Sequence, residues 1–279
     1  MALYFNRIFS IFSMILTIPF RNSRITVKDE GSGKAVLLLH GYLESMDIWG
    51  YFARQLTRHY RVVSIDIPGH GQSGVIAVEH SMSLMAEAVA IVLHQLQIPQ
   101  CVIIGHSMGG YVSLACLAEF PDQLAGICLF HSSPFADSEE KRMARAKEIR
   151  LIEAGKLSLI CNISIPNSFA EENLQVMDEK VELVKNIACQ TSPEGAIAIL
   201  EGMRNRPDRN DFLCRNIRPV QFILGKKDDL VTFDELYPVA LSYPNTTVNI
   251  LEHSGHLGFL EEPENSVKFV LSFLEKCYA

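Results

Sequence analysis

Residues 101 to 111 read CVIIGHSMGGY, a run that suits no single regular secondary structure. Four apolar residues are followed at once by Gly-His-Ser and then by a pair of glycines. Glycines weaken a strand interior or a helix start unless the backbone there has an unusual conformation. The run therefore predicts a buried strand that turns sharply into a helix, with Ser107 at the turn.

Gly105, Ser107 and Gly109 match the pattern G-x-S-x-G, and the pattern has its required context of a strand before it and a helix after it. Such a turn forces its central residue into a strained conformation and brings the glycines so close to neighbouring backbone that a Cβ atom would collide. The Ser107 hydroxyl is then held beside the first amides of a helix, where a developing negative charge is stabilised. We interpret Ser107 as a nucleophile.

A serine hydroxyl needs a base to remove its proton, and the base needs a carboxylate that orients it. His256 lies between the last predicted strand and the last predicted helix, so we expect it at the sheet edge where Ser107 emerges, with His253 as a near competitor. Asp228 and Asp229 follow another strand, which gives the chain order serine, acid, histidine. At this point either aspartate can be the acid.

The remaining histidines are given no part in the chemistry. The His106 side chain adjoins Ser107 but is expected to point away from the hydroxyl. Hydrogen-bonded structural roles are expected for His59, His80, His94 and His131.

Apolar runs of strand length alternate with segments of helical periodicity along most of the chain. Such runs are typical of strands buried on both faces, and their order with intervening helices predicts right-handed crossovers in a mostly parallel, doubly wound α/β sheet flanked by helices. The rhythm stops in a charge-rich, helical segment that we interpret as a cap. The expected domains are an apolar N-terminal extension (1–23), a core (24–133 and 217–279) and a helical cap or lid (134–216).

Composition restricts the partners and the compartment. The 279 residues carry a formal net charge of -7 with dispersed basic residues, which argues against nucleic acid as a partner. The seven cysteines form no C-x-x-C pair and lie mostly in apolar runs, so we expect buried thiols in the reducing cytoplasm, with no zinc site or disulfide framework.

The first 20 residues contain an apolar run, residues 8–18, that is too short to span a bilayer. Three interpretations stay open: an export or membrane-anchoring segment, a segment docked on the domain, or a start assigned upstream of Met14.

Five motifs together resemble one family over residues 24–278: HGYLES, DIPGHGQS, GHSMGG, GKKDDLV and SGHLGFLEEPE. The chain is similar to the α/β-hydrolase fold family, in its small branch of esterases, lactonases and C-C bond hydrolases. The resemblance implies Ser107 as nucleophile, His256 as general base and acid, and Asp228, favoured over Asp229 by its register after the glycine of GKKDDLV, as the orienting acid. It further implies an oxyanion hole made by the backbone amides of Tyr42 and Met108.

The expected function is hydrolysis of a small carboxylic ester, lactone or thioester through a Ser107 acyl-enzyme, without metal or cofactor, on a substrate with an apolar acyl group. Alternatives are C-C bond hydrolysis or perhydrolysis with the same triad, and a ligand-binding receptor with slow turnover. Dehalogenases and epoxide hydrolases of the family carry aspartate where this chain has Ser107, so those two activities are not expected. The oligomeric state stays open.

Overall fold

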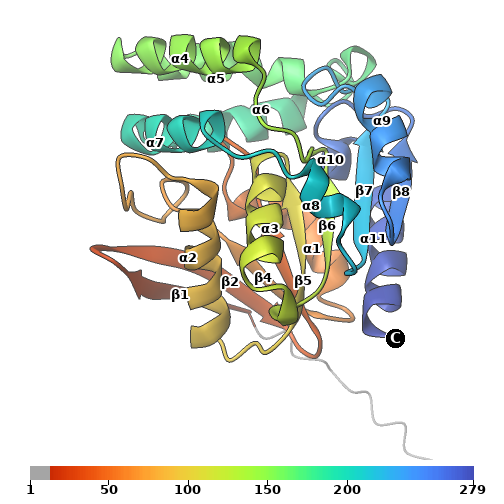
Figure 1. Cartoon of the computed structure of the whole chain (residues 1–279). Helices are drawn as coiled ribbons and strands as arrows, with labels where there is room; N and C mark the ends of the chain where they lie inside the picture. Colours follow the sequence, from red (N-terminus) through yellow and green to blue (C-terminus); the bar gives the residue numbers. More distant parts are fainter. Residues whose placement is uncertain (1–12) are drawn as a thin grey trace, which may run out of the picture.

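The computed structural model describes residues 13–279, and its centre is an eight-stranded sheet (Figure 1). The strand order is β1-β2-β4-β3-β5-β6-β7-β8, with β3 to β8 parallel and the two N-terminal strands antiparallel. The predicted mostly parallel α/β sheet is therefore confirmed. The strands are β1 (Ser13–Phe20), β2 (Ser23–Gly31), β3 (Ala35–Leu39), β4 (Arg61–Ile65), β5 (Cys101–His106), β6 (Leu124–Phe130), β7 (Val220–Gly225) and β8 (Thr246–Leu251).

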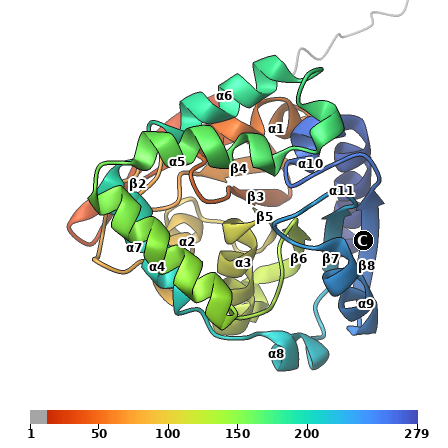
Figure 2. The same ribbon diagram turned by 90° about the horizontal axis from the view of Figure 1, so that it is seen from above.

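Helices cover both faces of the sheet, with α2 and α3 packed on one face and α1 and α11 on the other (Figure 2). Helices α4 to α7 lie together above one edge of the sheet (Figure 1). The helices are α1 (Gly50–Leu56), α2 (Met82–Gln95), α3 (Met108–Glu119), α4 (Glu139–Glu153), α5 (Leu157–Ser164), α6 (Asp178–Ala188), α7 (Pro193–Arg204), α8 (Asn210–Cys214), α9 (Phe233–Ser242), α10 (Gly258–Glu261) and α11 (Pro263–Tyr278), with short 3₁₀ turns η1 (Met46–Trp49), η2 (Pro121–Gln123), η3 (Pro166–Ser168) and η4 (Glu171–Asn173).

The four strands β3, β5, β6 and β7 are buried along their whole length. Because helices cover both faces, such strands read as continuous apolar runs rather than as alternating ones. Polar side chains at the carboxyl ends of these strands therefore come mostly from the loops that follow them, with His106, the last residue of β5, as an exception.

The sheet begins earlier in the chain than the sequence predicted. Residues 13–20, assigned to an extension outside the core, form the edge strand β1, which pairs with β2 from Ser13 opposite Glu30 to Phe20 opposite Ser23. The buried side chains of Ile18 and Phe20 alternate with exposed ones, so this half of the apolar run has the period of a strand. The rest of the run lies outside the described residues. Within residues 13–279, no helix has the length and apolar character needed to cross a membrane.

The expected burial of the cysteines is correct for Cys101, Cys116, Cys128 and Cys161. It is wrong for Cys189 and Cys214, which are exposed at the ends of α6 and α8.

A buried carboxylate fastens the helical segment between β6 and β7. Asp137, whose side chain is fully buried, forms ion pairs with Arg145 of α4 and with Arg206, two residues after α7. The Arg206 guanidinium also lies over the Tyr111 ring of α3, with 3.9 Å between its central carbon and the ring centroid. The Asp137 carboxylate therefore joins both ends of this segment, and Arg206 connects them to the core through its contact with Tyr111 of α3.

Replacing Asp137 by alanine is expected to lower the free energy of unfolding by about 3 kcal/mol or more, because two largely buried guanidinium groups lose their counter-charge. Urea denaturation of the wild type and the variant measures the difference. Glu139→Ala, which removes an exposed carboxylate two residues away, is the matched control and should change stability little. Equal stability of the two variants would contradict the prediction.

Candidate active site

Ser107 lies between β5 and α3 with a backbone φ of 49° and ψ of -113°. A side chain rarely adopts this conformation, and it is maintained here by close packing. A Cβ atom at Gly105 would collide with the carbonyl group of Gly109, and one at Gly109 would collide with that of Leu39. The Ser107 N–H donates to the Phe130 carbonyl oxygen of the neighbouring strand β6 at 2.9 Å. The sequence therefore folds into the sharp strand-to-helix turn that its glycines predicted.

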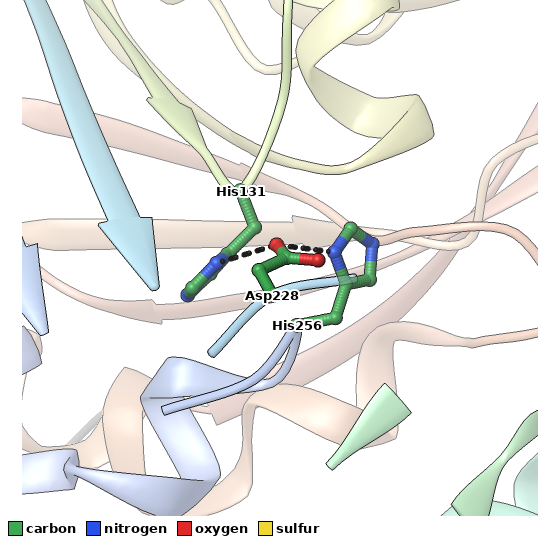
Figure 3. Close-up of side chains that lie close together, drawn as sticks. All are labelled: His131, Asp228 and His256. Carbon is green, nitrogen blue, oxygen red and sulfur yellow. Dashed lines mark hydrogen bonds and ion pairs between the residues drawn. The ribbon is translucent and has the colours of Figure 1, made fainter. Parts of the chain in front are cut away.

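The structure brings Asp228, and not Asp229, to His256. The loop after β7 buries Asp228, and the His256 Nδ1 atom lies 2.8 Å from its Oδ2 atom (Figure 3). Asp229 is exposed and faces a surface hollow next to Lys226. The competing histidine, His253, is exposed and contacts Glu172 instead.

The Asp228 side chain is held by four hydrogen bonds, of which the sequence analysis expected only the one to His256. Besides the bond to His256, its Oδ1 atom accepts the backbone N–H groups of Leu230 and Val231, each at 2.9 Å. The fourth bond joins its Oδ2 atom to Nδ1 of His131 at 3.1 Å (Figure 3). His131 immediately follows β6, so its position at the end of a buried strand was a signal that pointed to the site.

The charges of this cluster favour a carboxylate beside a basic imidazole. Burial raises the pKa of Asp228, but the charge of His256 and the hydrogen bonds from both histidines outweigh it and hold the pKa well below its usual range. Burial lowers the pKa of His256, but attraction to Asp228 and their hydrogen bond outweigh it, so the net pKa is raised above 6.5. Asp228 is thus ionised across the physiological range.

The loop after β3 presents backbone amides toward the same region. The N–H groups of Gly41, Leu43 and Glu44 all donate within the protein. Across the described residues, the Tyr42 N–H has no such acceptor. Met108 is the first residue of α3, so its N–H has no partner within that helix. These two amides are available to a negatively charged oxygen.

The buried pair of His106 and Glu44 joins the loop after β3 to the loop that contains His256. His106 contacts the Glu44 carboxylate through Nδ1 at 3.0 Å and the His256 carbonyl oxygen through Nε2 at 2.8 Å. Burial raises the pKa of Glu44, but the charge and hydrogen bond of His106 outweigh it and lower the pKa overall.

Ser107 and His256 face one cavity of about 360 Å³. The hydrogen bonds among the described residues do not include one between the Ser107 hydroxyl and His256, and such bonds are often long before a substrate binds. The cavity is lined from below by Tyr42 and Leu230 and from above by residues of the helical segment, among them Arg145, Glu148 and Met203. The Tyr42 hydroxyl donates to the Glu148 carboxylate at 2.9 Å across this space.

Comparisons with known proteins agree on the fold. Residues 34–148 match the family model described as alpha/beta hydrolase fold. A thermophilic esterase from Thermogutta terrifontis, solved with malate bound, superposes with a TM-score of 0.90 at 27% identity, covering 96% of this chain and 100% of that chain. The protein has the α/β-hydrolase fold.

Two relatives are similar to this hydrolase over most of its length. A pimeloyl-[acyl-carrier protein] methyl ester esterase from Aeromonas salmonicida is 26% identical over 259 residues, covering 90% of this chain and 99% of that protein. The dihydrolipoyllysine-residue acetyltransferase component of an acetoin cleaving system from Pseudomonas putida is 24% identical over 256 residues; the match covers 88% of this chain but only 64% of that protein's length. The predicted family resemblance is therefore confirmed, and the chain is a hydrolytic enzyme.

The hydrolase contains one group of side chains, within residues 13–279, whose spacing could hold a metal ion: His131, Asp228 and His256, with ligand atoms within 4.8 Å of one another. The hydrogen bonds between these same atoms account for the spacing. A metal would have to displace the N–H protons that now point at Asp228, so the group fits a hydrogen-bonded relay better than a metal centre.

Proposed function

We propose that the protein hydrolyses carboxylic esters, lactones or thioesters through an acyl-enzyme formed on Ser107. The observation that carries the proposal is the hydrogen bond between buried Asp228 and His256, whose ring faces the same cavity as the strained Ser107. The similarity to proteins named as esterases, from Thermogutta terrifontis and Aeromonas salmonicida, supports this reaction class.

In the proposed mechanism, His256 accepts the Ser107 proton at Nε2 while the serine oxygen attacks the carbonyl carbon. The negative charge that develops on the carbonyl oxygen is stabilised by the N–H groups of Tyr42 and Met108. His256 then gives its proton to the leaving alcohol or thiol, and the acyl group stays on Ser107. Water, deprotonated by His256, attacks the acyl-enzyme; as the bond to Ser107 breaks, His256 returns the proton to the serine oxygen and the acid is released. Asp228 orients the imidazole and stabilises its charged form throughout.

We further propose that residues 134–216 act as a cap that shapes the substrate site. The apolar side chains of Ile165, Val184 and Met203 line the cavity from this segment and suit an apolar acyl group. A cavity of about 360 Å³ is near the lower end of the usual range for small-molecule sites. Substrates with short acyl chains are therefore the proposed class.

Two measurements on the purified protein test the function. p-Nitrophenyl acetate should give a burst of p-nitrophenol if an acyl-enzyme accumulates, and the rate should fall as the acyl chain is lengthened beyond the cavity. A fluorophosphonate probe should label one peptide, and mass spectrometry should place the label on Ser107. Absence of both hydrolysis and labelling, or a label on another residue, would contradict the proposal.

The acid side of the pH profile follows from the raised pKa of His256. The base must be neutral to accept the serine proton, and a raised pKa keeps it protonated to higher pH, so activity is lost as pH falls through that value. We expect the acid-side midpoint of kcat/KM to lie above 6.5. Hydrolysis of p-nitrophenyl acetate from about pH 5 to about pH 9, corrected for the spontaneous rate, measures it. A midpoint clearly below 6.5 would show that Asp228 does not act on His256 as described.

A further inference from the structure

His131, the second histidine that is hydrogen-bonded to Asp228, is held in one orientation and one protonation state. The His131 side chain is fully buried, and its Nε2 atom accepts the Gly258 N–H at 3.2 Å. An imidazole nitrogen that accepts a hydrogen bond carries no proton, so the single proton of neutral His131 is on Nδ1 and points at Asp228 Oδ2. Burial lowers the pKa of His131 to about 4, although the hydrogen bond to Asp228 opposes the shift.

Three further observations mark His131 as a built part of the site. Its backbone has a φ of 49°, a conformation rare for residues other than glycine. Its hydrogen bond goes to Oδ2 of Asp228, the same oxygen that His256 contacts. Its ring centroid lies 5.8 Å from that of His256. A side chain held at this position affects both the place and the charge of the carboxylate oxygen that His256 uses.

We propose that His131 is a positioning residue which, as a permanent neutral donor to Asp228 Oδ2, fixes the acid and limits the negative charge that it presents to His256. The inference rests on the proposed function, since it assigns His131 a role in tuning the proposed base. A hydrogen bond to Oδ2 spreads part of the carboxylate charge onto the His131 ring. His256 is therefore a weaker base than it would be against a carboxylate without this donor, and is neutral over a wider pH range.

Other titratable groups also face His256, and substitutions at position 131 leave these residues themselves in place. These are Glu44 in the loop after β3, His106 at the end of β5 and Glu261 in α10. Glu44 and Glu261 raise the pKa of His256 in all variants. A difference in the acid-side midpoint between variants at position 131 therefore reports a change in the hydrogen bonding of the Asp228 oxygen.

Two substitutions separate the hydrogen bonds of His131. In His131→Asn the side-chain amide nitrogen occupies the place of Nδ1, which keeps the donor to Asp228 but removes the acceptor for Gly258 N–H. Asparagine also tolerates a positive φ. In His131→Gln the amide oxygen reaches the place of Nε2, which keeps the acceptor for Gly258 but removes the donor to Asp228. Each variant is thus the control for the other.

The readout is the rate constant for inactivation by a fluorophosphonate probe as a function of pH, because it depends on deprotonation of Ser107 by His256 and needs no known substrate. We expect the acid-side midpoint to move up by about 0.5 to 1 pH unit in His131→Gln, for the loss of one hydrogen bond to a carboxylate. In His131→Asn it should stay at the wild-type value. A merely structural role would lower the melting temperature of both variants and leave both midpoints unchanged, and that result would overturn the inference.

A second measurement does not depend on how the variants fold. In wild-type protein with ¹⁵N-labelled histidine, nitrogen chemical shifts should show His131 as a neutral ring protonated on Nδ1 at neutral pH. A ring protonated on Nε2, or a charged ring, would overturn the inference. Failure of the proposed function is distinguishable: the wild type would then not be labelled, or labelling would survive Ser107→Ala, whereas failure of this inference leaves Ser107-dependent labelling intact.

Discussion

Ser107→Ala is expected to lower kcat for ester hydrolysis by about 10⁴-fold or more, because loss of the nucleophile leaves only substrate binding and the oxyanion site to act on the substrate. The fold should be unaffected because alanine keeps the Cβ atom that the strained turn already accommodates. Initial rates with p-nitrophenyl acetate, together with the thermal unfolding curve, measure both effects.

Ser164→Ala is the matched control, because Ser164 lines the same cavity from α5. It should keep kcat within a few-fold of the wild type, because Ser164 has no part in the proposed chemistry. Hydrolysis that persists at a wild-type rate in Ser107→Ala would remove the acyl-enzyme mechanism, whatever the outcome for Ser164.

Asp228→Asn is expected to lower kcat by about 10⁴-fold, because the amide no longer supports the charged imidazole and can hold His256 in the wrong tautomer. Asp229→Asn is an unusually close control: the two aspartates are adjacent in the chain, yet only one is buried against His256. The Asp229 variant should have the wild-type kcat and the wild-type acid-side midpoint.

The pair of variants is read by steady-state kinetics at a pH well above the acid-side midpoint. Similar losses in both would mean that the negative charge of the loop, rather than the hydrogen bond to His256, supports activity. A large loss in Asp229→Asn alone would assign the acid to the exposed residue and contradict the proposed site.

Most of the sheet could be predicted because its strands are buried on both faces and therefore read as continuous apolar runs. Three such runs, residues 35–39, 61–65 and 124–130, coincide with β3, β4 and β6. Strand β1 was missed because its apolar run continues into residues 8–12, and this obscured the alternation between Leu16 and Phe20 that marks a strand.

The chemistry-bearing residues differ in how far local sequence defines them. Ser107 is marked by the glycines around it, and His256 and Asp228 by their place after predicted strands. His131 follows a predicted strand too, but its contact with Asp228 depends on β6 and β7 being neighbours in space, with the helical segment of residues 134–216 between them in the chain. No periodicity or spacing carries that information. The same holds for His106 of β5, because its partners, the Glu44 side chain and the His256 carbonyl oxygen, lie in two separate loops.

The groups proposed to carry out the reaction and the helices that line the cavity come from different parts of the chain, which affects how proteins of this fold can diversify. Every group proposed to act on the reacting bond comes from a loop that follows a strand of the sheet or from the first residue of α3, whereas α4 to α7 contribute only to the cavity wall. Mutational drift or grafting of these helices can thus retune selectivity while reactivity is inherited intact, provided that Asp137 retains its arginines and position 148 an acceptor for Tyr42.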